Sequence, residues 1–597
     1  MKNKTYLYSL IFIIFVQVIY LSLIFSFGKE GYHSDEIYNY GFANSYYMKD
    51  LDNSKSEDSI FQKWNSSQLF KDYVTVDENH RFAFDAVIKN CNMDYNPPFQ
   101  FMLLHAICSL FPGVFSWYFC FIINIISFVI SQIFIFLLSK SITKSNIVGI
   151  CSVILYGFCV GGMDIAIFMR IYGLGTMFIV LFMYFSHKIY NGVFKDTKTL
   201  IYCYIFCFIS LFLGAYSMHV FLIPAFFITL SYCFYYLFSK HIKQFFIYGF
   251  TCLGAVALSC VLYPKTFENL GINISHSGVS SSEVSYSLIK YPLPMQLRLY
   301  AYQFTRDLFG IHIDPLPNPY FEYFLIGLFC FIVLAIPICI VVRKEKWFRS
   351  AILNIKNRFL SVFKKIKQFN VSILVLLISF LSVWFFAAWK TSWYLMKVCA
   401  NRYLFVGYPL AAVFSVVSAY YIFRFLFNKK ISLIILIVLS CSLSFLSHCE
   451  SQSHAFLFEH YTEGITFDEI EDDSNNVLIL SSPWTIVFFA PKFYNTNSFF
   501  ATDMETYKNN YYFEEIDNKQ PYYVILDLTY ILKRELDAND PEDQNILDIY
   551  KDSADLFTLE SKVTEFFEAE SNVDYLELIG TDEIMHRTYH IYKVHFK

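Results

Sequence analysis

The sequence predicts a mainly α-helical, polytopic membrane protein of about eleven spanning helices, followed by a small α/β domain. Three observations carry this prediction. Of the 597 residues 56% are hydrophobic, only 16% are charged, and apolar runs long enough to cross a bilayer core of ~30 Å recur as far as residue 448. A water-soluble chain of this length could not bury so much apolar surface. The bilayer is therefore expected to be its main solvent.

The apolar runs mark the predicted spans in chain order. They lie near residues 7–27, 114–138, 147–163, 165–186, 199–215, 217–238, 245–263, 321–342, 370–389, 402–427 and 431–448. No small-residue cleavage pattern follows the first run, so it is expected to remain as a helix and not to be removed as a signal peptide. Residues 98–111 are apolar but too short to span, which predicts a helix lying on the membrane surface.

Lysine and arginine predict which loops face the cytoplasm, because cationic loops are retained there. They gather at the N-terminus and in every second loop, most densely between Arg343 and Lys367. The N-terminus is therefore expected in the cytoplasm. The segments expected outside are residues 28–113, the turns near 164 and 216, residues 264–320, residues 390–401 and the tail from 449. Abundant Phe, Tyr, Ile, Asn and Lys is compatible with an AT-rich bacterial genome, so the expected location is a bacterial cell membrane.

The last 149 residues differ from the rest of the chain, because acids far outnumber bases there. Strand-like runs cover 476–480 and 522–528, and a helical-looking acidic stretch lies between 540 and 570. We therefore expect a transmembrane catalytic domain over residues 1–448, with an outer loop at 28–113, and an acidic extracytoplasmic α/β domain over residues 449–597.

Two adjacent acids, Asp35 and Glu36, lie just beyond the first span in GYHSDEIYNYG. One interpretation is that they only cap a surface helix, since acids favour helix starts. The other is catalytic. Tyr38 and Tyr40 follow at once and supply ring faces and hydroxyls of the kind that line sugar and headgroup sites. A carboxylate beside such a wall is suited to act as a general base.

A second acid, Asp164, is expected in a very short outer turn, in GGMDIAIFMRIYGLG, with Arg170 and Tyr172 entering the next span. An arginine that deep usually faces an aqueous cavity or a partner acid. The alternative is an interfacial acid and a snorkelling arginine. His219, near the outer end of another span, and His105, on the surface helix, are either substrate-binding groups or histidines satisfied between helices.

Several outer-facing cations are candidates for holding a phosphate, arginine by its bidentate fork. Arg402 stands at the headgroup level in CANRYLFVGYPLAAV, next to Tyr403, and the outer loop 264–320 adds Arg298 and Arg306. The alternative for each is a simple interface anchor.

The absent patterns narrow the function. There is no Walker A loop and no GxGxxG, and the single DxD, at residues 50–52, is attributed to chance. The 15 cysteines include no CxxC pair, so neither a disulfide framework nor a zinc site is predicted. Charged residues within the spans are too few for an ion pathway, which weighs against transport.

Four segments together, HSDEIYNYG, NPPFQFMLLH, FMRIYGLGT and NRYLFVGYPL, resemble the GT-C membrane glycosyltransferases, in particular the bacterial glycosyltransferase family 39 group with protein O-mannosyltransferases and aminoarabinose transferases. The resemblance covers roughly residues 1–450. The chain departs from it where many relatives read HPPL and this one has Asn96-Pro97-Pro98-Phe99, and in the less aromatic context of His219. The resemblance implies a sugar donor carried on a polyprenyl phosphate, which suits an enzyme facing away from the cytoplasmic nucleotide sugars.

The resulting hypothesis is an inverting transfer at the outer face, in which Asp35 deprotonates the acceptor hydroxyl. The predicted catalytic residues are Asp35, Glu36 and Asp164; the donor phosphate would be held by Arg402, Arg170, Arg298 and Arg306; and the substrates would contact Tyr38, Tyr40, His105, Tyr172, His219 and Tyr403. Glu36 would orient Asp35 or the acceptor, and Asp164 would border the cavity.

The partners expected are the polyprenyl-phosphate sugar, membrane lipid and a protein, lipid or glycan acceptor, with no nucleic acid. A divalent metal is conceivable, but metal-independent activity is predicted. One alternative is a non-catalytic protein, either a flippase of lipid-linked saccharides or an envelope-assembly protein. Another is a ligase or polymerase that uses an oligosaccharide donor.

Overall fold

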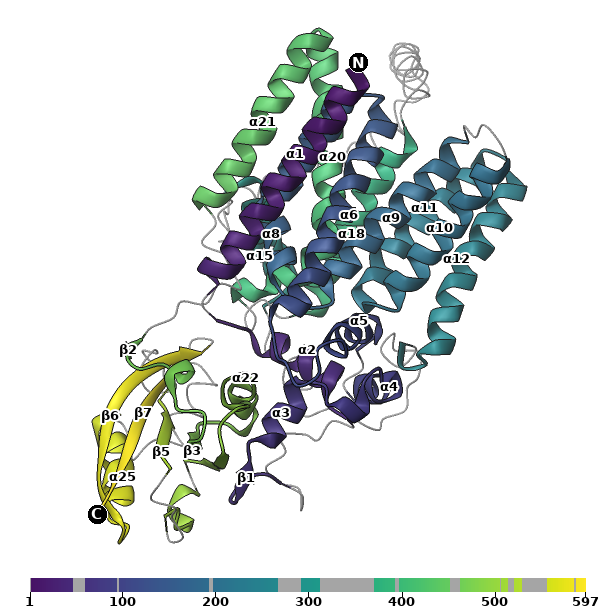
Figure 1. Cartoon of the computed structure of the whole chain (residues 1–597). Helices are drawn as coiled ribbons and strands as arrows, with labels where there is room; N and C mark the ends of the chain where they lie inside the picture. Colours follow the sequence, from purple (N-terminus) through teal and green to yellow (C-terminus); the bar gives the residue numbers. More distant parts are fainter. Residues whose placement is uncertain are drawn as a thin grey trace, which may run out of the picture.

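The computed structural model describes residues 2–29, 31–46, 59–93, 96–192, 197–266, 291–311, 370–391, 397–450, 462–504, 506–513, 520–528, 556–584 and 587–597. Its helices form a bundle, and a β-sheet domain lies against one end of that bundle (Figure 1). We call this the sheet end.

The bundle is built from long apolar helices. They are α1 (Lys2–Leu23) with the π-helical turn η1 (Ile24–Gly28), α6 (Tyr118–Thr143), α7 (Asn146–Phe158), α8 (Val160–Ile167), α9 (Tyr172–Asn191), α10 (Thr197–Ala215), α11 (Leu222–Phe238), α12 (Ile242–Leu262), α15 (Leu293–Phe309), α18 (Val371–Lys390), α20 (Tyr408–Leu426) and α21 (Lys429–Glu450). Eight described helices are long and apolar enough to cross a membrane, or nine spans if the bent pair α7 and α8 counts as one. The chain is a multi-pass membrane protein. The predicted span at 321–342 lies outside the described residues.

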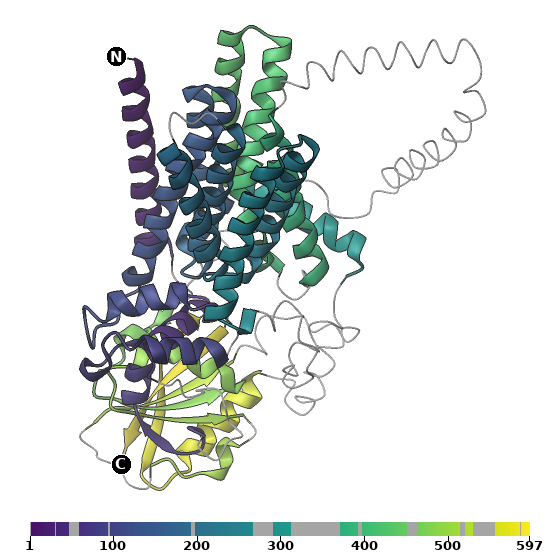
Figure 2. The same cartoon turned by 90° about the vertical axis from the view of Figure 1, so that its right-hand side faces the viewer.

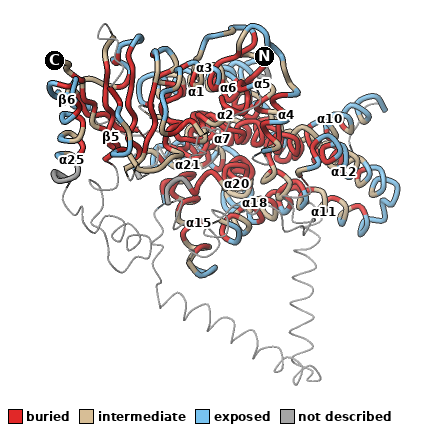
Figure 3. The backbone as a smooth tube through the Cα atoms, turned by 90° about the horizontal axis from the view of Figure 1, so that it is seen from below, coloured by how far each residue is buried: buried red, intermediate tan, exposed pale blue. Residues whose placement is uncertain are grey.

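Burial differs between the centre and the rim of the bundle. The tube seen from below is red over central α7 and pale blue along stretches of the peripheral helices α10 and α12 (Figure 3). Large apolar side chains such as Phe206, Phe250 and Val261 are exposed there. In a bilayer these side chains face lipid, so their exposure carries no cost.

The bend between α7 and α8 corrects the predicted position of Asp164. The two helices meet at 62° around Cys159, whose backbone is extended. A Cβ atom added at Gly162 would lie 2.0 Å from the Tyr156 carbonyl oxygen, and one added at Gly161 would lie 2.8 Å from the Tyr408 ring. Only glycine therefore fits this close approach. Asp164 lies on α8, not in a turn, and is 2% exposed.

Short helices form a layer between the bundle and the sheet. They are α2 (Ser34–Asn44), α3 (Gln68–Val74), η2 (Glu78–His80), α4 (Phe84–Met93) and α5 (Phe99–Cys108). Helix α5 confirms the short apolar helix predicted at 98–111, and it packs against α2. The remaining short elements at this end are the 3-10 helices η3 (His219–Phe221) and η4 (Lys397–Gly407).

In the part of the chain that the structure describes, the C-terminal domain is a seven-stranded mixed sheet in the order β1-β4-β3-β5-β7-β6-β2. Its strands are β1 (Trp64–Ser66), β2 (Glu463–Gly464), β3 (Asn475–Leu480), β4 (Ser498–Asp503), β5 (Tyr522–Asp527), β6 (Val573–Ile584) and β7 (Arg587–Phe596), with the helical segments η5 (Phe467–Glu469), η6 (Pro483–Phe489), α22 (Ala490–Phe493), η7 (Tyr507–Asn509) and α25 (Leu556–Glu568). Strands β3 and β5 confirm the two predicted runs, and α25 covers the described part of the predicted acidic helix.

The sheet takes its edge strand from the first loop, so residues outside the predicted C-terminal domain contribute to the sheet. Strand β1 pairs antiparallel with β4. Close by, Phe70 on α3 stacks on Phe499 at 4.1 Å between ring centroids, and both rings are fully buried. The sheet therefore lies directly beneath the short helices (Figure 2), and residues 61–74 belong to the same core as the tail.

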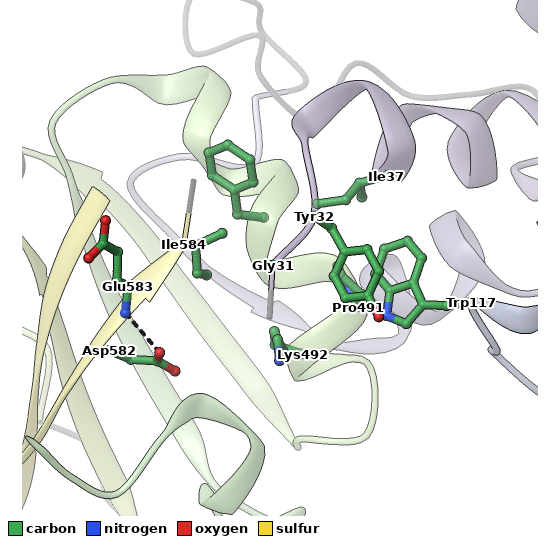
Figure 4. Close-up of a pocket in the computed structure, with 10 residues that line it drawn as sticks. Gly31, Tyr32, Ile37, Trp117, Pro491, Lys492, Asp582, Glu583 and Ile584 are labelled. Carbon is green, nitrogen blue, oxygen red and sulfur yellow. Dashed lines mark hydrogen bonds between the residues drawn. The ribbon is translucent and has the colours of Figure 1, made fainter. Parts of the chain in front are cut away.

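A small pocket marks the contact between the two parts (Figure 4). On the bundle side Tyr32 stacks on Trp117 at 3.7 Å. On the sheet side the pocket is lined by Lys492, Asp582 and Glu583. This contact places the C-terminal domain beside the start of α2, where the candidate site begins.

Candidate functional site

The site begins with an N-capped helix just after the first span. Helix α2 starts at Ser34 with a capping box, in which the His33 ring nitrogen accepts from the Asp35 amide at 3.1 Å and Glu36 accepts from the His33 amide at 2.8 Å. The helix-cap interpretation of the acid pair is therefore correct for Glu36. It also fixes where Asp35 lies, because the backbone of Asp35 is bonded to the cap.

Glu36 is a buried anchor. Its Oε2 also accepts from Lys29 Nζ at 3.0 Å, and its Oε1 accepts from the Met169 amide at 3.0 Å. Burial raises the pKa of Glu36, although Lys29 and the two backbone amides oppose that rise. With no exposed surface, this carboxylate joins the end of the first span, α2 and the segment before α9.

Asp35 lies in a different environment from its neighbour. Its side chain is 25% exposed, and its Oδ2 lies 2.5 Å from Arg402 Nη1 and 4.0 Å from Arg170 Nε. Burial would raise the pKa of Asp35, but the charges of Arg170 and Arg402 outweigh it and hold that pKa well below its usual range. We call Asp35, Arg170 and Arg402 the arginine clamp.

Each arginine of the clamp makes a further contact besides the one to Asp35. Arg170 donates to Asn39 Oδ1 at 3.0 Å, and Asn39 lies one helical turn after Asp35 on the same face of α2. Arg402 comes from η4 and lies over the Tyr403 ring, 5.3 Å from its centroid. Each arginine is only 8% exposed, so both guanidinium groups are largely shielded from water beside the carboxylate.

The clamp carries a net positive charge. Burial lowers the pKa of His33 to about 4, and the three nearby cations add to that effect while Asp35 opposes it. His33 is therefore neutral near pH 7. One carboxylate then faces two guanidinium groups in a partly exposed site, which suits an anionic ligand such as a phosphate.

A second acidic cluster lies nearby but is closed to solvent. Asp164 Oδ2 accepts from Asn401 Nδ2 at 2.9 Å. Asp307 on α15 accepts from the Tyr408 hydroxyl at 3.1 Å and from Arg306 Nε at 3.2 Å. All five residues are at most 9% exposed. We call this set the buried network. Arg306, one of the predicted phosphate ligands, is part of it through its bond to Asp307.

Of the remaining predicted residues, Tyr172 and Tyr403 lie beside the clamp, and His219 lies on an element that packs against η4. Tyr172 interacts electrostatically with Arg402 and Asp35, and Tyr403 stacks beneath Arg402. His219 lies on η3, which packs against η4, and its ring stacks on Tyr263 at 6.4 Å.

Three of the predicted substrate-binding side chains lie in packed surroundings. Tyr40 is fully buried and donates to the Ser116 carbonyl at 2.7 Å, and Tyr38 stacks on Phe42. His105 is buried edge-on against Phe84 at 5.6 Å. Arg298 is half-buried on α15.

An apolar groove opens on the other face of α5. Its described lining comes from α5, α6 and α9 with Phe82, and Ser127 is the only polar residue among these. Gln100, also on α5, donates to Cys120 on α6. Next to it, Asn124 donates to the Phe168 carbonyl at 2.7 Å. This polar layer borders the clamp, because Asn39 also donates to Cys120 at 3.8 Å. The described lining of the groove includes no residue of the clamp.

Sequence reasoning missed five residues that build or support the site: Lys29, Asn39, Asp307, Asn401 and Tyr408. Asn39 could have been found from its one-turn spacing after Asp35. Asp307 and Asn401 are each adjacent to an arginine that was predicted. No signal in the sequence indicates that Lys29 turns back to Glu36. Among the described residues, no group of three or more His, Cys, Asp or Glu side chains is arranged to hold a metal.

No family model and no curated protein sequence matches the chain. Among solved structures it is similar to ArnT from Cupriavidus metallidurans bound to undecaprenyl phosphate, with 9% identity, a TM-score of 0.42 and coverage of 99% of this chain and 97% of that one. For ArnT in the apo state the identity is 10%, the TM-score is 0.41, and the match covers 99% of this chain and 98% of that one. For the apo oligosaccharyltransferase of Archaeoglobus fulgidus the identity is 12%, the TM-score is 0.39, and the match covers 87% of this chain and 70% of that one.

Proposed function

We propose that this protein transfers a sugar from a polyprenyl-phosphate donor to an acceptor hydroxyl, with inversion and with Asp35 as the general base. One observation carries the proposal. A partly exposed carboxylate lies 2.5 Å from one arginine and 4.0 Å from another at the end of a membrane-spanning bundle. Such a site combines a proton acceptor with a binding site for the phosphate of a lipid.

The two arginines suit the leaving group. When the bond between the anomeric carbon and the phosphate oxygen breaks, the phosphate departs with the electron pair and is already a weak base. It needs neutralisation of its charge more than a proton. Arg402 and Arg170 offer that charge from positions that are mostly shielded from water, where the interaction is stronger than in bulk solvent.

The low pKa of Asp35 requires that donor binding activate the base. With Arg402 bonded to it, Asp35 accepts a proton poorly, because an effective general base has a pKa near the working pH. A donor phosphate competes for the same guanidinium groups. As Arg402 and Arg170 turn toward the phosphate, the pKa of Asp35 rises. Asp35 then takes the proton from the acceptor hydroxyl as that oxygen attacks the anomeric carbon.

The proposed reaction takes place on the non-cytoplasmic side, because the cationic loops predict the opposite end of the bundle to be cytoplasmic. The donor is membrane-tethered and the acceptor is a protein, lipid or glycan hydroxyl. We propose that no metal is needed, since two guanidinium groups already supply the positive charge. The C-terminal domain, completed by β1, would lie over the site on the acceptor side.

The flippase alternative predicts charged or strongly polar residues along a path through both halves of the bundle. In the described part of the bundle, the buried charged side chains belong to the sheet end: Lys29, Glu36, Asp164, Arg170, Arg306, Asp307 and Arg402. The buried His187, near the C-terminal end of α9, bonds to serine hydroxyls at 2.7 and 2.9 Å, and the buried Gln17 and Gln132 lie within α1 and α6. The buried charge of the described bundle is nevertheless one-sided, which favours an enzyme.

The test is transfer from a polyprenyl-phosphate sugar by purified protein. Asp35→Asn should lower turnover by at least about 1,000-fold, because the amide keeps the shape but cannot accept the proton. The control is Asp72→Asn, on α3, where the acid bonds only to Gln68 within its own helix. Near-normal turnover by Asp35→Asn, at the expression level of the control, would remove Asp35 from the proposed role.

A further inference from the structure

The segment that carries Arg402 has an unusual conformation. Helix η4 runs as a 3-10 helix for 11 residues, whereas such runs seldom exceed 3–4 residues because their hydrogen bonds are poorly aligned. A long 3-10 segment needs support from its surroundings. Its support decides where Arg402 lies relative to Asp35.

Consecutive residues of η4 reach two different acids. Arg402 reaches Asp35 in the arginine clamp, and Asn401 donates to Asp164 at 2.9 Å. Asn401 is fully buried and Asp164 is 2% exposed. A hydrogen bond to a carboxylate away from water is among the stronger polar contacts in a protein. This bond lies next to Arg402 in the middle of η4.

The buried network fixes η4 at its end as well. Tyr408 is the first residue of α20, directly after η4, and its hydroxyl bonds Asp307. The backbone carbonyl of Asp307 accepts from Ser447 at 2.8 Å, and the Ser447 oxygen accepts from the Val160 amide at 2.9 Å. Helices α8, α15, α20 and α21 are thus joined around one end of η4.

We propose that Asp164 is a positioning residue, whose carboxylate holds Asn401 and thereby sets the distance between Arg402 and Asp35. Asp164 touches no reacting atom in this assignment, which replaces the catalytic role expected from its sequence position. The effect of Asp164 on transfer rests on the proposed function. Its effect on η4 does not.

A reciprocal exchange of the two side chains tests the assignment. Asp164→Ala should lower kcat/KM by roughly 100-fold, the loss expected when a reacting group is displaced by about 1 Å. Asp164→Asn keeps an acceptor oxygen at the same place and should stay within about fivefold of the wild type. Asn401→Asp places two carboxylates face to face and should be strongly impaired. The double variant Asp164→Asn with Asn401→Asp restores the pair with its roles reversed and should recover at least about tenfold.

The pH profile separates positioning from general damage. The groups that face Asp35 are Arg402 from η4, Arg170 from the segment before α9, Tyr172 from the start of α9 and His33 from its own cap. If Asp164→Ala lets Arg402 drift, the acid limb of kcat/KM moves to higher pH, and the double variant moves it back. A variant that is only less stable would lose active protein without shifting the limb.

A readout without substrate keeps the two proposals distinguishable. Amide hydrogen exchange at residues 397–407 of the full-length protein should quicken in Asp164→Ala and slow again in the double variant. The positioning role would be overturned if Asp164→Asn were as inactive as Asp164→Ala. It would also be overturned if the double variant restored neither the transfer rate nor the slow amide exchange. Full activity of Asp35→Asn, together with slow amide exchange in the double variant, would instead overturn the proposed function alone.

Discussion

The arginine clamp and the buried network are both built on η4, yet they suit opposite purposes. Asp35 has a quarter of its side chain exposed and is bonded by charged side chains that a ligand can draw away. Asp164 is 2% exposed and is bonded by a neutral amide. If the two acids act as proposed, exposure and the charge of the partner separate a reactive acid from a structural one, even when both lie at the same end of the bundle.

The same contrast holds between the neighbours Asp35 and Glu36. Glu36 is tied to two backbone amides and to Lys29, so it cannot leave its place without unfolding the start of α2. The pKa values of the two acids shift in opposite directions. Each prediction below tests one side of this division between reactive and anchoring groups.

The largest expected effect is on stability, from Glu36→Gln. The amide cannot neutralise Lys29, whose side chain is fully buried, and removing one partner of a buried pair typically costs about 3–5 kcal/mol. Thermal unfolding in detergent measures the loss. Asp35→Asn, one residue earlier, should change stability by less than about 1 kcal/mol. Equal losses in the two variants would contradict the division.

Arg402→Gln should act mainly on the reaction. Removing this guanidinium lowers kcat/KM by roughly 100-fold to 1,000-fold, because truncating one partner of a mostly buried charge pair costs about 2–5 kcal/mol. Arg402→Lys should recover about tenfold of this, since the ammonium keeps the charge but not the bidentate fork. Kinetics over a range of donor concentrations provide the measurement. A lysine variant as inactive as the glutamine variant would point to shape and not to charge.

His33 predicts a pH-dependent stability. Its pKa is lowered from about 6.5 unfolded to about 4 folded, so the unfolded chain binds the proton first as the pH falls. Stability is fully present above about pH 6.5 and is lost toward pH 4, by about 2 kcal/mol at pH 5. The wild type should therefore lose stability as the pH falls relative to His33→Asn, which caps a helix without titrating, and unfolding midpoints of the two proteins measure this loss. A constant gap would contradict the assignment.

Much of the membrane fold could be predicted from the sequence, because apolar runs report directly on spans. The positions at which a span is broken could not be predicted in this way. The runs at 147–163 and 165–186 are nearly continuous, so a turn at 164 was the natural expectation. The break falls instead at Cys159, where two glycines allow close packing against Tyr156 and Tyr408. Strand β1 was also hidden, since three residues in a polar loop show no alternation, and their partner lies about 430 residues away.

The candidate site was predictable in part. Asp35, Arg170 and Arg402 could be found because a charged residue at a membrane surface is conspicuous in an apolar chain. Their pairing could not, since the Arg402–Asp35 contact joins residues 367 positions apart. Neutral partners such as Asn39 and Asn401 carry no comparable signal, because amides are common in loops and at helix ends.

The most direct test of the central claim is the pH dependence of transfer, with the donor concentration varied at saturating acceptor. The acid limb of kcat/KM reports the free protein and that of kcat the donor complex. If the donor phosphate draws the arginines away from Asp35, kcat should fall at a higher pH than kcat/KM as the solution is made acidic. Acid limbs at the same pH, or one at a lower pH for kcat, would contradict the account.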